Sequence, residues 1–454
     1  MKEWLTFHKT VRGSSHTKKG LPCQDASYSE DTDEYVLLTV SDGHGDSSCI
    51  RSDAGSEIAV KAAGQCLREF AESLLENEEL YQLLKLENHQ KELVRRLTDS
   101  IISSWSDQVI QHFQSHPLET AELEMLGYTE EKVFSREEIE HYYGATLLAA
   151  VMTGNLLLMI QQGDGRCVIL TDHGAEEPVP WDERCYSNVT TSLSDKDAST
   201  RIRYAMIFTD ETPVAACFLT SDGVEDSYRD MDGTYRLLKK LTCASVKESQ
   251  FPQYLEQMVS ELSELGSGDD TTVAGSVCLK MAEQLAEQYQ KEIIKSETEE
   301  SLKTDREKLI SMERRLAILK KKAEEAGRSI EEIKEEKRHL ETQLSILDFK
   351  KRSRRLIVDD LNEQQVSELE EAGKSGISRF YFTQFNLLKE LHRKYKEAIQ
   401  SIQNKIDEHD RMLSDPDLEE NRVISEYQEY LEKYKEIENR ISRTENEIKQ
   451  SGGN

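Results

Sequence analysis

Long apolar runs and export signals are absent from this sequence. No stretch of its 454 residues approaches the roughly 18 consecutive apolar residues that a membrane-spanning helix needs. The first residues, 1–8, lack the apolar centre of a secretory signal peptide. These absences predict a protein that is neither exported nor inserted in a membrane, and the cytoplasm is the expected location.

Positive charge is scarce as well. The chain has 58 Lys and Arg residues against 87 Asp and Glu residues, which gives a net charge of −29. Nucleic-acid binding needs a basic face, so this balance argues against nucleic acid as a partner. The same charge would be repelled by an anionic membrane surface, and most of it is expected to be solvated surface.

Cysteine pairs with the spacing of a metal or redox site are also missing. The eight cysteines are scattered, without a single Cys-x-x-Cys pair, at positions 23, 49, 66, 167, 185, 217, 243 and 278. In a chain without an export signal such residues are expected to be reduced thiols. The pattern predicts neither a zinc site nor a disulfide framework.

Proline almost disappears in the second part of the chain. All eight Cys, all three Trp and six of the seven Pro precede residue 280, and only Pro416 follows it. Beyond that point the sequence consists of long runs rich in Glu, Lys, Gln, Leu and Ile. This change predicts two domains, residues 1–280 and residues 281–454.

What the first domain does contain is a set of strands that end at acidic residues. The apolar run 36–40 is expected to be a buried strand, and it leads directly into Asp42, Gly43 and His44. Five acids have such a place beside an apolar strand: Asp25, Asp42, Asp164, Asp222 and Asp269. One Asp-Gly pair after a strand usually marks a turn. Five converging carboxylates would repel one another unless cations were bound or their pKa values were raised, and such hard ligands favour Mg²⁺ or Mn²⁺ over zinc.

The order of these motifs resembles the metal-dependent protein phosphatases of type 2C. The motifs that carry the resemblance are Gln24-Asp25-Ala26, Ser41-Asp42-Gly43-His44-Gly45, Gly144-Ala145-Thr146, Gly163-Asp164-Gly165-Arg166, Ser221-Asp222-Gly223 and Asp269-Asp270-Thr271-Thr272. Each motif is weak alone, but six in this order are specific. The resemblance covers about residues 5–280. It implies an α+β fold, a four-layer αββα sandwich of two antiparallel sheets, with a metal centre at one end.

The resemblance implies metal-binding roles for six residues: Asp25, Asp42, Gly43, Asp164, Asp222 and Asp269. Asp42 would bridge two metals, and Gly43 would offer its backbone carbonyl to the first. Asp222 and Asp269 would bind the second metal. Asp25 would hold waters of the first metal, and Asp164 would bind a weaker third metal. The expected cofactors are therefore two Mg²⁺ or Mn²⁺ ions, with a third left open.

Catalysis is expected to depend on Asp42 and His44. Two divalent ions can lower the pKa of a shared water so that it attacks phosphorus. The resemblance makes His44 the general acid that protonates the leaving oxygen, a contribution of roughly 10²–10⁴ in rate. One departure is that most members carry a phosphate-clamping arginine at the position of Gly20. Lys19, Lys18 and His16 are the candidate replacements, although lysine is a point charge where arginine is a bidentate fork.

The second domain is expected to be an all-α coiled-coil or helical-bundle arm. A 3-4 spacing runs through Leu309, Met312, Leu316, Leu319, Ala323, Ala326, Ile330, Ile333, Lys337, Leu340, Leu344 and Leu347. Helices are expected at about 285–350, 380–413 and 416–450, with interruptions near 350–379 and 414–417. An antiparallel bundle within one chain is favoured over a parallel homodimer, but both stay open.

Two short motifs lie in the first interruption. The basic patch 350–355 is interpreted as a solvated turn, and the sharper alternative is a docking site for an acidic or phosphorylated partner. The stretch 373–376 lacks the upstream glycine and the strand of a phosphate-binding loop, so nucleotide binding is not expected there.

Together these features predict a serine/threonine protein phosphatase that uses a metal-activated water. Its substrate would be a phosphorylated protein, a serine/threonine kinase would oppose it, and the arm would recruit partners or form a homo-oligomer. The alternative is a weakly active or inactive phosphatase fold that binds phosphoproteins as a scaffold, and the missing arginine favours it. A phosphatase for small phosphoesters is a third hypothesis, against which the long arm argues.

Overall fold

The computed structural model describes residues 4–128, 133–186, 189–325 and 418–451, together with short stretches between residues 338 and 404. It divides into two compact units, Met1–Glu297 and Thr298–Asn454. The domain boundary near residue 280 stays a prediction, and the helix α11 (Leu279–Glu325) runs across that position.

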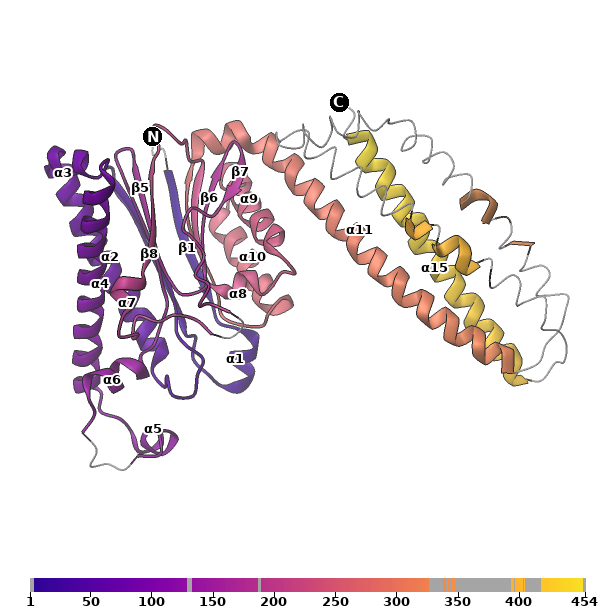
Figure 1. Ribbon diagram of the computed structural model, residues 1–454, viewed down its shortest axis with the longest axis horizontal. Helices are drawn as coiled ribbons and strands as arrows, with labels where there is room; N and C mark the ends of the chain where they lie inside the picture. The colour runs from indigo at the N-terminus through magenta and orange to yellow at the C-terminus, as the bar shows by residue number, and fades with distance from the viewer. Residues whose placement is uncertain are drawn as a thin grey trace. The chain divides into compact units, whose positions relative to one another are not determined.

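The first unit is built on two antiparallel sheets of five strands each (Figure 1). One sheet has the order β1-β10-β9-β6-β7, with β1 (Trp4–Val11), β10 (Thr271–Cys278), β9 (Ala216–Thr220), β6 (Arg166–Thr171) and β7 (Gly174–Glu176). The other has the order β2-β3-β4-β5-β8, with β2 (Asp25–Asp31), β3 (Tyr35–Asp42), β4 (Leu147–Thr153), β5 (Leu156–Gln162) and β8 (Arg203–Phe208).

Helices cover the outer face of each sheet, so the unit has four layers (Figure 1). α2 (Ser52–Glu76) and α4 (Glu87–Ser115) pack on the second sheet through a core that includes Leu37 and Trp105. α9 (Met231–Lys247), α10 (Phe251–Leu265) and the start of α11 pack on the first sheet. A third apolar cluster, with Val40 and Cys217, fills the space between the sheets. The predicted αββα sandwich is confirmed.

Six short helices complete this unit: α1 (Ser14–Lys19), α3 (Glu78–Leu83), α5 (Thr120–Met125), α6 (Arg136–Tyr142), α7 (Ala198–Arg201) and α8 (Asp222–Glu225). The acidic sequence over 116–139 favours an irregular surface segment, and this expectation is wrong for α5 and the start of α6. Each of these two helices begins with a capping box, in which the N-cap residue and the third helical residue satisfy each other's backbone groups.

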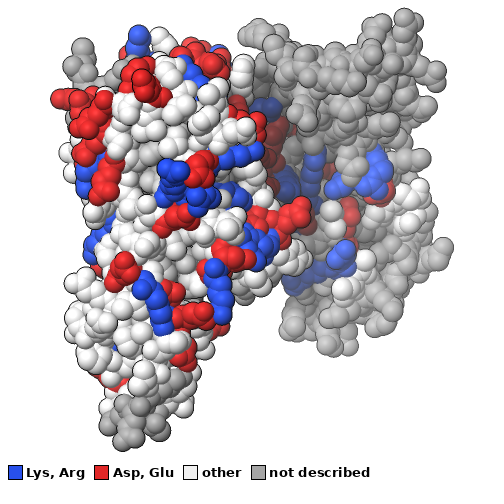
Figure 2. All heavy atoms as spheres, turned by 60° about the vertical axis from the view of Figure 1, so that its left-hand side comes forward, with Lys and Arg blue, Asp and Glu red and all other residues white. Residues whose placement is uncertain are grey.

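The outer face over α2 and α4 mixes acidic and basic side chains (Figure 2). Many of them form exposed pairs one helical turn apart, such as Lys61 with Glu57 and Lys91 with Glu87. Exposed pairs of this kind contribute little to stability, so the buried apolar face holds these helices in place. Within the described residues, no helix combines the length and the apolar character that crossing a membrane requires.

The second unit contains the rest of α11 and α15 (Leu418–Ser451). Three contacts relate the two helices: Asp305 with Arg440, Arg315 with Tyr430, and Glu313 with Tyr434. A higher number on one helix pairs with a lower number on the other, so the helices are antiparallel. Part of the predicted 3-4 seam packs between them, through Leu309, Met312, Leu316 and Leu319. The basic patch 350–355, the stretch 373–376 and the interruption at 414–417 lie outside the described residues.

Candidate active site

One end of the sandwich holds a cavity of about 850 Å³ into which most of the predicted site residues face. Eight of them line it: His16, Lys19, Asp42, Gly43, His44, Asp164, Asp222 and Asp269. Asp25 is not among the lining residues; it is buried beside them, with 7% of its surface exposed. The structure therefore brings all nine predicted positions to one place.

The convergence follows from strand register. Asp25 begins β2 and pairs directly with Asp42, which ends β3. In the other sheet β9 ends at Thr220, which pairs with Val273 near the start of β10, so the segments leading to Asp222 and Asp269 meet. Each acid is thus at the same end of its sheet, where the rigid strands fix its position.

Asp42 and Asp222 are close enough for their carboxyl groups to share a hydrogen bond. Burial is the largest cause that raises the pKa of both groups, to about 7 for Asp222. Burial also raises the pKa of Asp25 to about 7, although the hydroxyl of Thr272 donates a hydrogen bond of 2.7 Å to its carboxylate. Repulsion between these carboxylates adds to the effect of burial.

This charge balance fits bound divalent cations. Seven aspartates line the cavity, and Lys19 is the only Lys or Arg among the described lining residues. The available donors are carboxylate oxygens and the Gly43 carbonyl, which are hard ligands of the type that Mg²⁺ and Mn²⁺ prefer. Such ions would offset the repulsion among the acids.

The turn after β3 depends on close backbone approach. A Cβ on Gly43 would lie 2.5 Å from the carbonyl oxygen of Ser52, so only glycine fits. His44 follows, and its ring lies against Gly144, where a Cβ would come within 2.7 Å of the ring carbon Cδ2. The backbone N–H of His44 donates to the Gly144 carbonyl at 3.0 Å. Burial lowers the pKa of the His44 ring, and the nearby carboxylates of Asp164 and Asp195 act in the opposite direction.

The two adjacent acids before β10 have different surroundings. The Asp269 side chain is 53% exposed and lines the cavity, whereas that of Asp270 is 3% exposed. Asp270 accepts hydrogen bonds from the backbone N–H groups of Gly13 and Gln24, both at 2.6 Å. It therefore holds together both ends of the segment that contains α1.

His16 and Lys19 are presented by α1. The His16 ring lies between the two acids, with Nε2 3.3 Å from Asp269 and Nδ1 2.9 Å from Asp270. Lys19 is exposed at the end of α1, and the helix is terminated by Gly20 in a left-handed conformation with φ 73°. The position where the family resemblance leads one to expect arginine is thus a helix-terminating glycine, and the nearest free cation in the described site is Lys19.

Three residues of the site were not predicted from the sequence. Gln24 donates from Nε2 to the carbonyl of His44 at 3.1 Å and to the hydroxyl of Ser52, so it supports the turn. Asp226 lines the cavity one helical turn after Asp222, and this i, i+4 spacing is a signal that could have been used. Asp270 has the anchoring role described above, and the sequence offered no sign of it.

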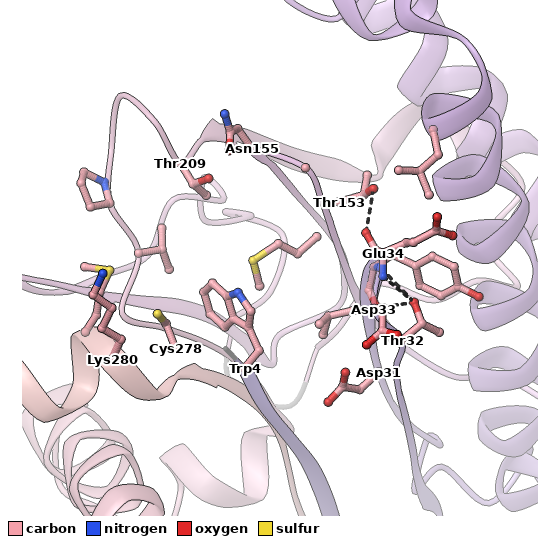
Figure 3. Close-up of a pocket in the computed structure, with 18 of the residues that line it drawn as sticks. Trp4, Asp31, Thr32, Asp33, Glu34, Thr153, Asn155, Thr209, Cys278 and Lys280 are labelled. Atoms are coloured by element: carbon pink, nitrogen blue, oxygen red, sulfur yellow. Dashed lines mark hydrogen bonds between the residues drawn. The ribbon is translucent and has the colours of Figure 1, made fainter. Parts of the chain in front are cut away.

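A second cavity, of about 760 Å³, lies at the opposite end of the sandwich (Figure 3). Trp4 lies near its centre, and Asp31, Asp33 and Glu34 lie on one side of it (Figure 3). Asp33 and Glu34 are exposed, so solvent screens their charge. The buried acids with raised pKa values belong to the first cavity, which makes that cavity the candidate active site.

A comparison with protein-family models agrees with the family resemblance seen in the sequence. A family model described as protein phosphatase 2C matches residues 12–264. A search of curated proteins gave no match.

Several solved structures share similarity with the chain. A bacterial serine phosphatase is 18% identical, with 60% of this chain and 97% of that one covered and a TM-score of 0.38. The Mycobacterium tuberculosis serine/threonine phosphatase PstP/Ppp is 13% identical, with 60% and 98% covered and a TM-score of 0.37. The S. agalactiae serine/threonine phosphatase is also 13% identical, with 60% and 99% covered and a TM-score of 0.36. Because these scores are low, the family assignment depends on the family model.

Proposed function

Because this chain belongs to the protein phosphatase 2C family, we propose that it hydrolyses phosphoserine and phosphothreonine in proteins at the acidic end of its sandwich. The family resemblance predicted from the sequence is confirmed, and the chain is a protein phosphatase, a phosphoric monoester hydrolase. The observation that carries the proposal is the convergence of seven aspartates, among them Asp42, Asp222 and Asp269, on one cavity at the end of the sandwich.

In this proposal the acids hold two Mg²⁺ or Mn²⁺ ions. When bound, these cations offset charge on the phosphate and make water a better nucleophile near neutral pH. Asp42, Asp222 and Asp269 would bind them directly with the Gly43 carbonyl. Asp25 would orient water molecules from its buried position, and Asp164 would bind a third ion.

The remaining residues of the site would protonate the leaving group and bind the phosphate. The serine or threonine alkoxide is a poor leaving group, so the His44 ring would donate a proton to its oxygen. Lys19 would bind the phosphate oxygens as a point charge, since the described part of the chain offers it no ion pair. His16 would stay fixed by Asp269 and Asp270 and would hold α1 so that Lys19 faces the cavity.

A small aryl phosphate tests this proposal, because it needs the metal centre but no protein contacts. Wild type is expected to hydrolyse it in the presence of Mn²⁺, and Asp42→Asn is expected to reduce turnover to background. Asp33→Asn is the matched control, because this exposed acid lines the other cavity. Absence of turnover by wild type at every Mn²⁺ concentration would contradict the proposal.

A scaffold that binds phosphoproteins without hydrolysing them is the second candidate. The observation that favours it is Gly20, because glycine offers no side chain at the position where the family resemblance leads one to expect arginine. This candidate predicts background turnover together with measurable phosphopeptide binding by wild type.

The second unit would be an arm for recruitment or assembly. Antiparallel packing of α11 on α15 buries part of the seam within one chain. A homo-oligomer, a kinase counterpart and a cytoplasmic location stay predictions.

A further inference from the structure

Residues 116–128 and 133–142 form a platform beside the catalytic cavity. Its first half is fastened by Arg51, a residue with 8% of its surface exposed. The Arg51 guanidinium forms two hydrogen bonds with the Glu122 carboxylate, of 2.7 and 2.8 Å. It also donates to the backbone carbonyls of His116 and Pro117. A buried arginine with this many partners holds α5 in a defined position.

Aromatic contacts hold the second half of the platform. The Phe134 ring makes edge-to-face contacts with Phe113, Tyr128 and Tyr142, with ring centroids 5.6–5.8 Å apart. Phe113 and Tyr142 belong to the core that contains α4. Tyr128 is thus connected through Phe134 to the sandwich itself, and its position does not depend on a ligand.

A pocket of about 600 Å³ opens on this platform. Met125, Leu126 and Tyr128 provide its apolar lining, and the Met125 side chain is unusually exposed, at 68%. His141 and Ser194 line both this pocket and the catalytic cavity, so the two are adjacent. A polypeptide with its phosphorylated residue in the cavity would therefore extend into the pocket.

The charged groups of the pocket are already engaged within the chain. Lys196 forms an ion pair with Glu137 at 2.7 Å, across the pocket rim. Glu138 accepts the backbone N–H of Ser135 in the capping box of α6. In Figure 2 the lower end of this unit, where α5 and α6 lie, shows fewer charged side chains than the face above it. Met125, Leu126 and Tyr128 form the apolar part of the lining, which has no such partners to replace and is available to an apolar side chain.

We propose that this pocket binds a bulky apolar side chain, such as leucine, of the phosphoprotein substrate next to its phosphorylated residue. The proposal rests on the phosphatase function proposed above and adds a determinant of specificity to it. Methionine suits this task, because its flexible thioether adapts to side chains of different shape. Discrimination by such a pocket is expected to be roughly 10-fold or more in kcat/KM.

The test uses the full-length protein and short phosphothreonine peptides that differ only by leucine or serine at one flanking position. Wild type is expected to favour leucine at one or two adjacent positions, roughly 10-fold in kcat/KM. Met125→Ser is expected to remove this preference without changing hydrolysis of an aryl phosphate, which does not reach the pocket. Leu86→Ser is the matched control, because Leu86 is an exposed apolar residue that does not line the pocket.

The outcomes separate this proposal from the proposed function. Equal kcat/KM for leucine and serine peptides in wild type, or an unchanged preference in Met125→Ser, would overturn it. If wild type fails to hydrolyse the aryl phosphate, the proposed function fails first. Fluorescence anisotropy with the same peptides then decides about the pocket: a leucine preference that Met125→Ser removes supports it, and its absence overturns it.

Discussion

At the scale of single residues, Asp269 and Asp270 show that two neighbouring acids just before a strand can have different roles. Asp269 lines the cavity, whereas Asp270 lies inside the fold, where backbone N–H groups hold its carboxylate. The sequence identified the pair as acids at the start of a strand and gave the ligand role to Asp269. It could not reveal that Asp270 fastens α1, because its partners, Gly13 and Gln24, lie about 250 residues away.

Substitutions of Asp269 and Asp270 are therefore expected to affect different properties, catalytic activity for Asp269 and stability for Asp270. Asp270→Ala would leave the buried N–H of Gly13 and that of Gln24 without an acceptor, at a cost of about 2–4 kcal/mol in the free energy of unfolding. Asp269→Ala should change that free energy by less than about 0.5 kcal/mol, because the side chain is largely exposed. It should nevertheless abolish Mn²⁺-dependent hydrolysis of an aryl phosphate. Denaturant unfolding and the phosphatase assay measure the two effects, and equal destabilisation by both variants would contradict the assignment.

At the scale of elements, most strands of the sandwich could be predicted. The run 36–40 is β3 (Tyr35–Asp42), and Thr153-Gly154 between two apolar runs favours a hairpin, which is the turn that joins β4 to β5. β4 and β5 are buried over their whole length, so continuous apolar runs mark them. α1 was missed because its residues, Ser14–Lys19, are all polar and none is buried. Periodicity cannot detect a helix that packs no apolar face, and only its tertiary anchor at Asp270 holds it.

The contact between β2, β3 and α2 gives a prediction about pH. Glu30 accepts hydrogen bonds from Arg68, Tyr28 and Tyr35, and chiefly the bond from Arg68 lowers its pKa to about 2. A lowered pKa stabilises the fold at pH values above the unfolded pKa of about 4.5, and this contribution is lost as the pH falls toward 2. Because Arg68 is partly exposed, screening reduces the contribution to about 1–2 kcal/mol.

Glu30→Gln should therefore lower the free energy of unfolding by about 1–2 kcal/mol at pH 7. The difference from wild type should shrink between pH 4.5 and pH 2, because wild type loses its own ion pair there. Unfolding in urea at a series of pH values measures this. Glu87→Gln serves as control, since Glu87 forms an exposed ion pair with Lys91 on the surface of α4 and its substitution should have no measurable effect. A constant difference at all pH values would contradict the linkage.

At the scale of the whole molecule, the boundary between the two parts of the chain depends on the criterion. Composition changes near residue 280, whereas the two compact units meet after Glu297. The first unit extends to Glu297 and includes the beginning of α11. Tyr289 and Ile293 from this helix are buried in the core beneath α9 and α10, and the Tyr289 hydroxyl donates to the carbonyl of Thr171 at 2.8 Å. Composition could not show this, because residues 279–297 share the Glu- and Lys-rich character of the remaining helix.

Two truncations that differ by thirteen residues test where the catalytic unit ends. A chain of residues 1–297 should fold and should hydrolyse an aryl phosphate as the full-length protein does. A chain of residues 1–284 loses Tyr289 and Ile293, and removal of two such buried side chains costs about 5–10 kcal/mol, comparable to the whole stability of a typical domain. It should therefore be unfolded or aggregated, as circular dichroism and size-exclusion chromatography would show. If the shorter chain instead kept full activity and an unchanged melting temperature, α11 would be an appendage from its first turn, and the boundary near residue 280 would be the true one.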